Sequence, residues 1–159
     1  MKYQVRQRLV SVGDDFDIRD ERGDKLYFVD GKGFTFGKDL AIKDMRRNRV
    51  ARIRQKFMTF SPSYKIYIHD RLAAVISKRL LSFRTRFHID VDGADNFETV
   101  GNMFLYDYKI YQDKRCVAQV SKKLFTFADS YGIHIEDDAD QLLMLSMAIV
   151  IDIVLHKGK

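Results

Sequence analysis

The feature that most constrains this chain is an internal repeat. Residues 64–93 align with residues 108–137 without a gap, at an offset of 44, and eleven of the thirty aligned positions are identical. A third copy lies 23 residues before the first, where Ala51 and Ile53 match Ala74 and Ile76. Apolar and polar residues alternate within the copies, and this period of two is typical of β-strands. The repeat therefore predicts a meander of similar strand pairs.

Each repeating unit carries a hydrophobic–small–aromatic triplet. These triplets are Phe34-Thr35-Phe36, Met58-Thr59-Phe60, Leu81-Ser82-Phe83 and Phe125-Thr126-Phe127, with Phe104-Leu105-Tyr106 as a looser version in the long gap. The spacing accommodates two strands and two connections per unit, and the segment from Tyr3 to Val12 adds one or two strands. Because closure leaves no unpaired edge, we expect a mainly β fold, a closed antiparallel β-barrel of about 12 strands over residues 3–136.

The last segment is of a different kind and predicts a helix over about residues 138–156. Asp138 followed by Gln141 resembles a capping box, and the residues from Leu142 to Leu155 are apolar on every face. A helix that is hydrophobic all round must be enclosed, and a barrel of this size has room for it. We therefore expect one domain over residues 1–159, with the C-terminal helix enclosed by the barrel.

Membrane insertion is the alternative for this apolar run. The run is shorter than the roughly 20 residues that span a bilayer, and it contains Asp152, so we expect no transmembrane segment. Asp152 is the most anomalous residue of the chain, since a buried carboxylate needs a partner. The expected partner is an inward-facing Tyr, Lys or Arg; alternatively, Asp152 marks the point where the helix leaves the barrel.

Several motifs resemble the LURP-one-related family. The run from Phe16 to Lys32 is similar to its opening signature, Phe-x-Ile-x-Asp-x-x-Gly-x-x-x-x-x-Val-x-Gly-Lys. Residues 75–79 and 118–123 resemble its recurrent strand that ends in paired cations, and the terminal apolar helix is similar as well. The resemblance covers about residues 3–156.

This resemblance implies the fold of the tubby C-terminal domains and phospholipid scramblases, a barrel of about twelve strands around a central helix. Tubby domains bind membrane phosphoinositides through basic residues, and scramblases are linked to calcium and lipid movement. No tubby phosphoinositide motif matches this chain position by position. The cysteine-rich palmitoylation stretch of scramblases is absent from it.

The positive charge of the chain is local. Residues 1–80 carry 19 cations and 10 anions, whereas residues 81–159 carry 9 cations and 12 anions. The focus is a predicted hairpin around Asn48, with cations at Arg46, Arg47, Arg49, Arg52, Arg54 and Lys56. Such a cluster suits phosphate groups, which arginine binds in bidentate fashion. The alternative is a solvated outer face whose arginine stems cover apolar surface.

Other candidate sites carry weaker signals. Asp90, Asp92, Asp95 and Glu98 surround a glycine and form a weak calcium candidate, for which an acidic hairpin turn is the alternative. Repeated tyrosines, Tyr64, Tyr67, Tyr106, Tyr108 and Tyr111, suit base stacking if they are exposed and cross-strand packing if they are not. The lone Cys116 reads as a small core residue.

The leading hypothesis is a non-catalytic cytoplasmic binding or scaffold module whose ligand is an anionic lipid headgroup or another phosphorylated molecule. A lipid ligand would place it at the membrane periphery. No catalytic motif is visible and no cofactor is predicted. A lipid-handling protein or enzyme with a site at a barrel mouth is the first alternative, and nucleic-acid binding the second.

Overall fold

The computed structural model describes residues 1–7, 16–31, 39–56, 63–79, 86–91, 96–124 and 130–156. Within these residues the chain forms twelve strands, two short 3-10 helices and one α-helix. The elements are β1 (Lys2–Gln7), β2 (Phe16–Arg19), β3 (Lys25–Asp30), β4 (Asp39–Asp44), β5 (Arg49–Lys56), β6 (Ser63–Ile68), β7 (Arg71–Arg79), β8 (Arg86–Val91), β9 (Asn96–Asn102), η1 (Met103–Leu105), β10 (Asp107–Gln112), β11 (Arg115–Ser121), η2 (Lys122–Leu124), β12 (Ser130–Ile135) and α1 (Gln141–His156).

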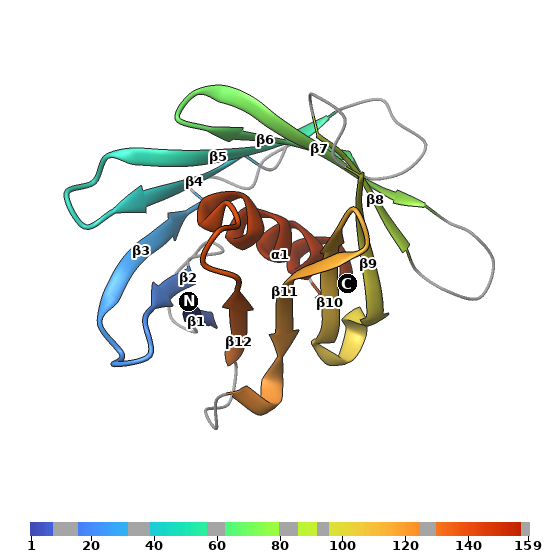
Figure 1. The fold of residues 1–159 in the computed structure, drawn as a ribbon. Coiled ribbons are helices and arrows are strands. Elements are labelled where there is room, and N and C mark those ends of the chain that lie inside the picture. Colours follow the sequence, from blue (N-terminus) through green and yellow to red (C-terminus); the bar gives the residue numbers. More distant parts are fainter. Residues whose placement is uncertain are drawn as a thin grey trace.

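The strands form one large antiparallel sheet (Figure 1). Strands from β2 to β12 pair with their sequence neighbours, and β1 pairs with both β2 and β12. Alternation explains the two faces of the sheet: Leu40 and Ile42 of β4 are buried, as are Ala51 and Ile53 of β5. The predicted mainly β fold with one C-terminal helix is confirmed. Four of the predicted triplets, at 34–36, 58–60, 81–83 and 125–127, lie outside the described residues.

The sequence repeat is also a structural repeat. At the offset of 44, β6 and β8 coincide with β10 and β12, and β7 begins where β11 begins. Both hairpins have a register shift at the same place, after Ile66 in β6 and after Ile110 in β10. Both also turn through two residues with positive φ, His69–Asp70 and Asp113–Lys114. The two units therefore share their irregularities as well as their strands.

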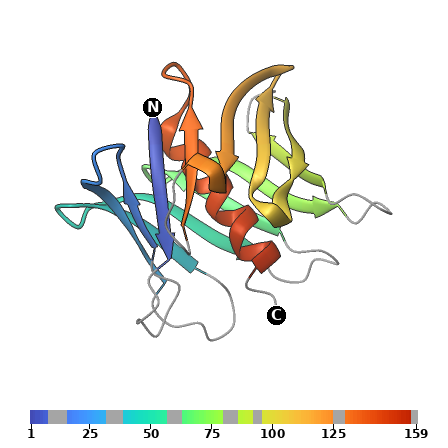
Figure 2. The same ribbon diagram turned by 90° about the horizontal axis from the view of Figure 1, so that it is seen from below.

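The C-terminal helix fills the interior of the molecule (Figure 2). It contacts β5, β6, β7, β12 and η1. Its buried apolar residues lie on every face, as predicted: Leu143, Met144, Leu145, Met147, Ala148, Ile149, Val150, Ile151, Ile153 and Leu155. Burial of each larger side chain stabilises the fold by about 1.5–3 kcal/mol, so α1 is a major part of the core.

The start of the helix differs from the prediction. Asp140, rather than Asp138, caps α1: its carboxylate accepts a hydrogen bond from Leu143 N at 3.0 Å, and its carbonyl accepts one from Met144 N at 3.0 Å. Asp138 is engaged elsewhere, since both of its carboxylate oxygens accept hydrogen bonds from Arg115, at 2.7 and 2.5 Å. The predicted capping box was therefore wrong, because Asp138 binds a strand residue.

Candidate functional site

The turn between β4 and β5 is ordered by Asp44. Its carboxylate accepts hydrogen bonds from Arg46 N at 2.9 Å, from Asn48 N at 2.8 Å and from Asn48 Nδ2 at 3.0 Å. These bonds hold the pKa of Asp44 below its usual value, and the hydrogen bond from the Asn48 side chain has the largest effect. Arg47 takes the left-handed conformation with φ of 68°. The turn thus presents Arg46 and Arg47 to solvent on a fixed backbone.

The outer face of β5 carries cations that are already paired. Arg52 donates two hydrogen bonds to Asp39, at 2.9 and 2.5 Å, and Arg54 lies 3.8 Å from the same carboxylate. The Arg52 hydrogen bond is the main cause that lowers the pKa of Asp39. As predicted, the apolar side chains of β5 face inward, with Ala51 and Ile53 buried. Asp39 therefore offsets much of the charge on this strand.

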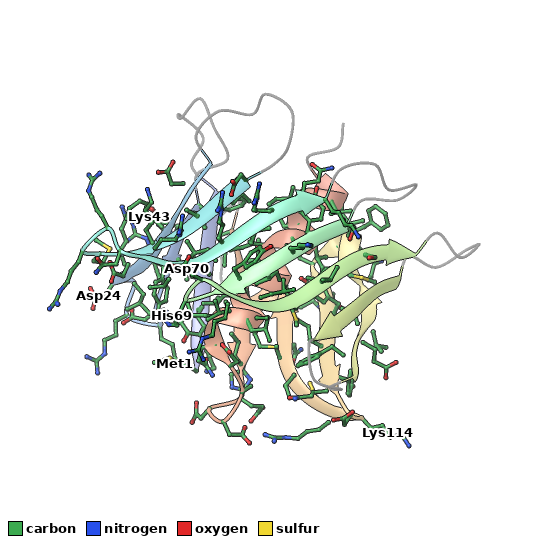
Figure 3. The ribbon with its side chains drawn as sticks, turned by 90° about the horizontal axis from the view of Figure 1, so that it is seen from above. Met1, Asp24, Lys43, His69, Asp70 and Lys114 are labelled. Carbon is green, nitrogen blue, oxygen red and sulfur yellow. The ribbon has the colours of Figure 1, made fainter. Side chains whose placement is uncertain are left out.

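A second pairing connects this strand to the next hairpin. Arg49 donates to Asp70 at 2.8 Å, and His69 N donates to the carbonyl of Val50 at 3.0 Å. Figure 3 shows His69, Asp70 and Lys43 on the same side of the molecule, with Lys114 at a distant corner. The turn between β6 and β7 therefore lies against the start of β5 and shares its charge.

Part of the predicted cluster forms no ion pair among the described residues. These cations are Arg46, Arg47 and Lys56, and all three are exposed. Lys56 lies at the far end of β5, roughly 30 Å from Arg47 at about 3.3 Å per residue. Arg46 and Arg47 thus share the β4–β5 turn, whereas Lys56 lies apart from them.

Asp152 lies at the opposite end of the strands and has the kind of partner that was predicted. It is 5% exposed, and Tyr106 Oη donates to Asp152 Oδ1 at 2.5 Å. Because Ile153 and Leu155 beyond it are also buried, Asp152 does not mark the exit of the helix. The alternative interpretation of this residue was wrong.

Aromatic rings surround this buried carboxylate. Tyr106 stacks on Tyr131 with ring centroids 4.9 Å apart, and Lys122 Nζ lies 4.7 Å from the centroid of the Tyr106 ring. Burial, followed by the charge of Asp152, raises the pKa of Tyr108 and Tyr131 well above the usual value. These two phenols therefore stay protonated near neutral pH and do not act as bases. Among the described residues, Tyr106 donates to Asp152, whereas the buried Tyr131 Oη has no hydrogen-bond partner.

The other candidates are placed as follows. Tyr64 and Tyr108 are buried, so the structure assigns these two to packing rather than to base stacking. Cys116 is only half-buried, and its Sγ donates to the carbonyl of Ala118 at 3.6 Å, so its assignment to the core was wrong. It adjoins the register shift of β11, where the strand alternation changes.

The calcium candidate falls mostly outside the part of the chain that the structure describes. Asp92 and Asp95 are not described, nor is the side chain of Asp90 on β8, while Glu98 is exposed on β9. Within the described ranges, no three or more His, Cys, Asp or Glu side chains gather as metal ligands would. In the same ranges, no helix has both the length and the apolar character needed to cross a bilayer.

Comparison with known proteins places these features in a family. The chain is 28% identical over 155 residues to the uncharacterized protein YxjI of Bacillus subtilis strain 168, a match that spans 98% of this chain and 94% of the relative. A crystal structure of an Arabidopsis thaliana protein has the same fold, with a TM-score of 0.70, 14% identity, and coverage of 95% of this chain and 90% of that one. The LURP-one-related family model matches residues 1–152, and the chain therefore belongs to the LURP-one-related family.

Proposed function

We propose that this protein is a non-catalytic binding module whose β4–β5 turn binds phosphate-bearing anions through Arg46 and Arg47. The observation that carries the proposal is the contrast within the basic hairpin. Arg49, Arg52 and Arg54 pair with the chain's own carboxylates, whereas Arg46 and Arg47 project from an ordered turn. The two arginines are consecutive residues of one ordered turn, and each guanidinium group can bind phosphate oxygens in bidentate fashion.

Binding rather than catalysis is supported by the neighbours of these arginines. Asp44, the carboxylate at the base of the turn, has a lowered pKa and several hydrogen-bond donors. A carboxylate of that kind is a poor general base near neutral pH. Asn48, which binds Asp44, has no acid–base chemistry of its own. The turn is therefore suited to hold an anion and not to transform it.

The phosphate has two possible sources, a membrane lipid headgroup or a free phosphorylated molecule. In the first case the protein acts at the cytoplasmic surface of a membrane, and in the second it acts within the cytoplasm. One experiment separates them: titration with soluble inositol hexakisphosphate, alongside sedimentation with phosphatidylcholine vesicles that contain phosphatidylinositol bisphosphate. Binding to the vesicles alone indicates a headgroup, and binding to the soluble probe indicates a free ligand.

The variant Arg46→Gln plus Arg47→Gln tests the residues. Because each arginine contributes a charge-assisted contact to phosphate, we expect the affinity for the responsive probe to fall by about 10-fold or more. The matched control is Lys2→Gln plus Lys114→Gln, which removes two exposed cations elsewhere and, at Lys114, a residue with a similar left-handed φ. Equal affinity in the two variants, or no binding of either probe by the wild type, would contradict the proposal.

We further propose that the sheet closes completely around α1, as in the tubby C-terminal domains. Support comes from the pairing of β1 with both β12 and β2, and from the burial of α1 on every face. In a closed sheet α1 is the filling of the interior, so its removal leaves an apolar lining with nothing to pack against. That consequence is tested by the helix truncation described in the Discussion.

A further inference from the structure

A second exposed surface lies at the end of the strands opposite to the β4–β5 turn. Three large apolar side chains are exposed there within six residues: Val100 at 53%, Phe104 at 54% and Leu105 at 67%. Exposed lysines adjoin them. Lys109 pairs with Val100 across β9 and β10, and Lys122 and Lys123 belong to η2. We call Val100, Phe104, Leu105, Lys109, Lys122 and Lys123 the η edge.

The η edge is held in place from inside the molecule. Met103, the first residue of η1, is buried, and Asn102 Oδ1 accepts a hydrogen bond from Leu105 N at 3.1 Å. Tyr106 ends the turn in the left-handed conformation; its hydroxyl binds Asp152. With Met103 and Tyr106 anchored inward, Phe104 and Leu105 are directed to solvent. Their exposure therefore follows from an ordered turn.

The two 3-10 turns form one surface. Lys122 N donates to the carbonyl of Tyr106 at 3.1 Å, so η2 lies beside the end of η1. Among the described side chains near this edge, Asp107 at the start of β10 and Glu98 of β9 are exposed anions; the three lysines outnumber them. The η edge thus combines a projecting apolar tip with a positive surround.

We propose that the η edge docks this protein on an anionic lipid bilayer, with Phe104 and Leu105 in the interfacial region and the lysines against the headgroups. Apolar side chains that enter the interface, together with nearby cations, are the combination that binds a protein to an anionic membrane surface. Charge complementarity favours this partner, because three exposed lysines lie beside the apolar tip. The inference does not rest on the proposed phosphate site, which lies at the other end of the strands.

The chain contains no Trp, so a single introduced indole reports on its own environment. We expect Leu105→Trp to show a blue-shifted emission with phosphatidylcholine vesicles that contain phosphatidylserine, and no shift with phosphatidylcholine alone. The matched control is Leu72→Trp, at an exposed apolar residue near the start of β7, which should show no shift with either vesicle. The absence of a shift at Leu105→Trp with the phosphatidylserine vesicles overturns the proposal.

Sedimentation with vesicles, using chains that carry no introduced Trp, provides the second readout. Since each cation near an anionic surface contributes to attraction, Lys122→Gln plus Lys123→Gln should weaken binding to the phosphatidylserine vesicles by about 10-fold. Lys2→Gln plus Lys114→Gln, which removes two exposed cations at the other end of the strands, should leave it unchanged, so a general loss of positive charge is distinguished from the loss of this docking surface. If the emission of Leu105→Trp responds to protein concentration and not to vesicles, the edge pairs with a second copy and the bilayer proposal is wrong.

Discussion

The hairpins β6–β7 and β10–β11 are the same structure on the inside and different structures on the outside. Ile66 and Ile110 occupy equivalent positions and are both fully buried. The turns that follow use different partners: Asp70 accepts from Arg49 of the neighbouring hairpin, whereas Arg115 donates to Asp138 before α1. The repeat therefore preserves the residues that face the helix, while the outward residues of each copy have acquired their own contacts.

The prediction with the largest expected effect removes α1 from the interior that both hairpins line with buried residues. A chain that ends at Asp138 lacks α1, whose apolar side chains pack against the inner face of the sheet. We expect no cooperative thermal unfolding and an aggregated species, measured by circular dichroism and size-exclusion chromatography. The full-length variant Ile149→Asp, which places a charge at a fully buried position of α1, should be strongly destabilised in the same assays. A monomeric truncated chain with a sharp melting transition would refute the enclosed helix.

Substitution of the equivalent interior residues tests whether the two copies are energetically alike. Ile66→Ala and Ile110→Ala each remove a fully buried side chain, so each should lower the free energy of unfolding by about 2–5 kcal/mol. Urea denaturation measures both values.

The outward neighbours at the same offset, Lys65→Ala and Lys109→Ala, serve as controls and should change stability by less than about 0.5 kcal/mol. The losses of unfolding free energy for Ile66→Ala and Ile110→Ala can then be compared with each other. A difference larger than the lysine effects and the experimental error would show that the two copies are packed differently. Agreement between them would confirm that the repeat describes packing.

The smallest expected effect concerns the outward ion pair of the second copy. Hydrogen bonding from Arg115 lowers the pKa of Asp138 in the folded state. Because this pKa is lowered, the contribution of the ion pair to stability is fully present above the pKa of Asp in the unfolded chain, near pH 4. The contribution is lost as the pH falls through the lower pKa of Asp138 in the folded protein. We therefore expect Asp138→Asn to lose less of its melting temperature than the wild type between pH 5 and the acid range. An identical pH profile for both proteins would show that the pair contributes nothing to folding.

The interior was predictable from the sequence because it depends on local alternation. Apolar and polar residues alternate around Ile66 and Ile110, and this alternation identifies the inward face of the sheet. The apolar run of α1 requires enclosure, so the sequence predicted both the sheet and the helix. The polar partner of Asp152 was predictable by type, since a buried carboxylate needs a donor. That this partner is Tyr106 depends on how far η1 turns inward, which no local sequence pattern indicates.

The charged surface was less predictable because its contacts join distant segments. A run of six cations indicates a basic site, but Asp39 and Asp70 lie 13 and 21 residues from the arginines that they bind. Only the register of β4, β5 and β6 places them alongside β5. The exposure of Leu105 was missed for a similar reason: its triplet resembles the others, and the buried Met103 and Tyr106 bonds that direct it outward are tertiary contacts.

The pairing of the first strand with the last one has a consequence for how the chain acquires its structure during synthesis. The amino group of Met1 donates to the carbonyl of Ile135, across 134 residues of sequence, and α1 follows even later. Long-range pairings of this kind are slow to form. A chain emerging from the ribosome therefore presents an apolar sheet face, without its last strand and without its helix, until residues 130–156 have been synthesised. Chaperones that shield such surfaces have their longest opportunity to act on this protein before α1 emerges.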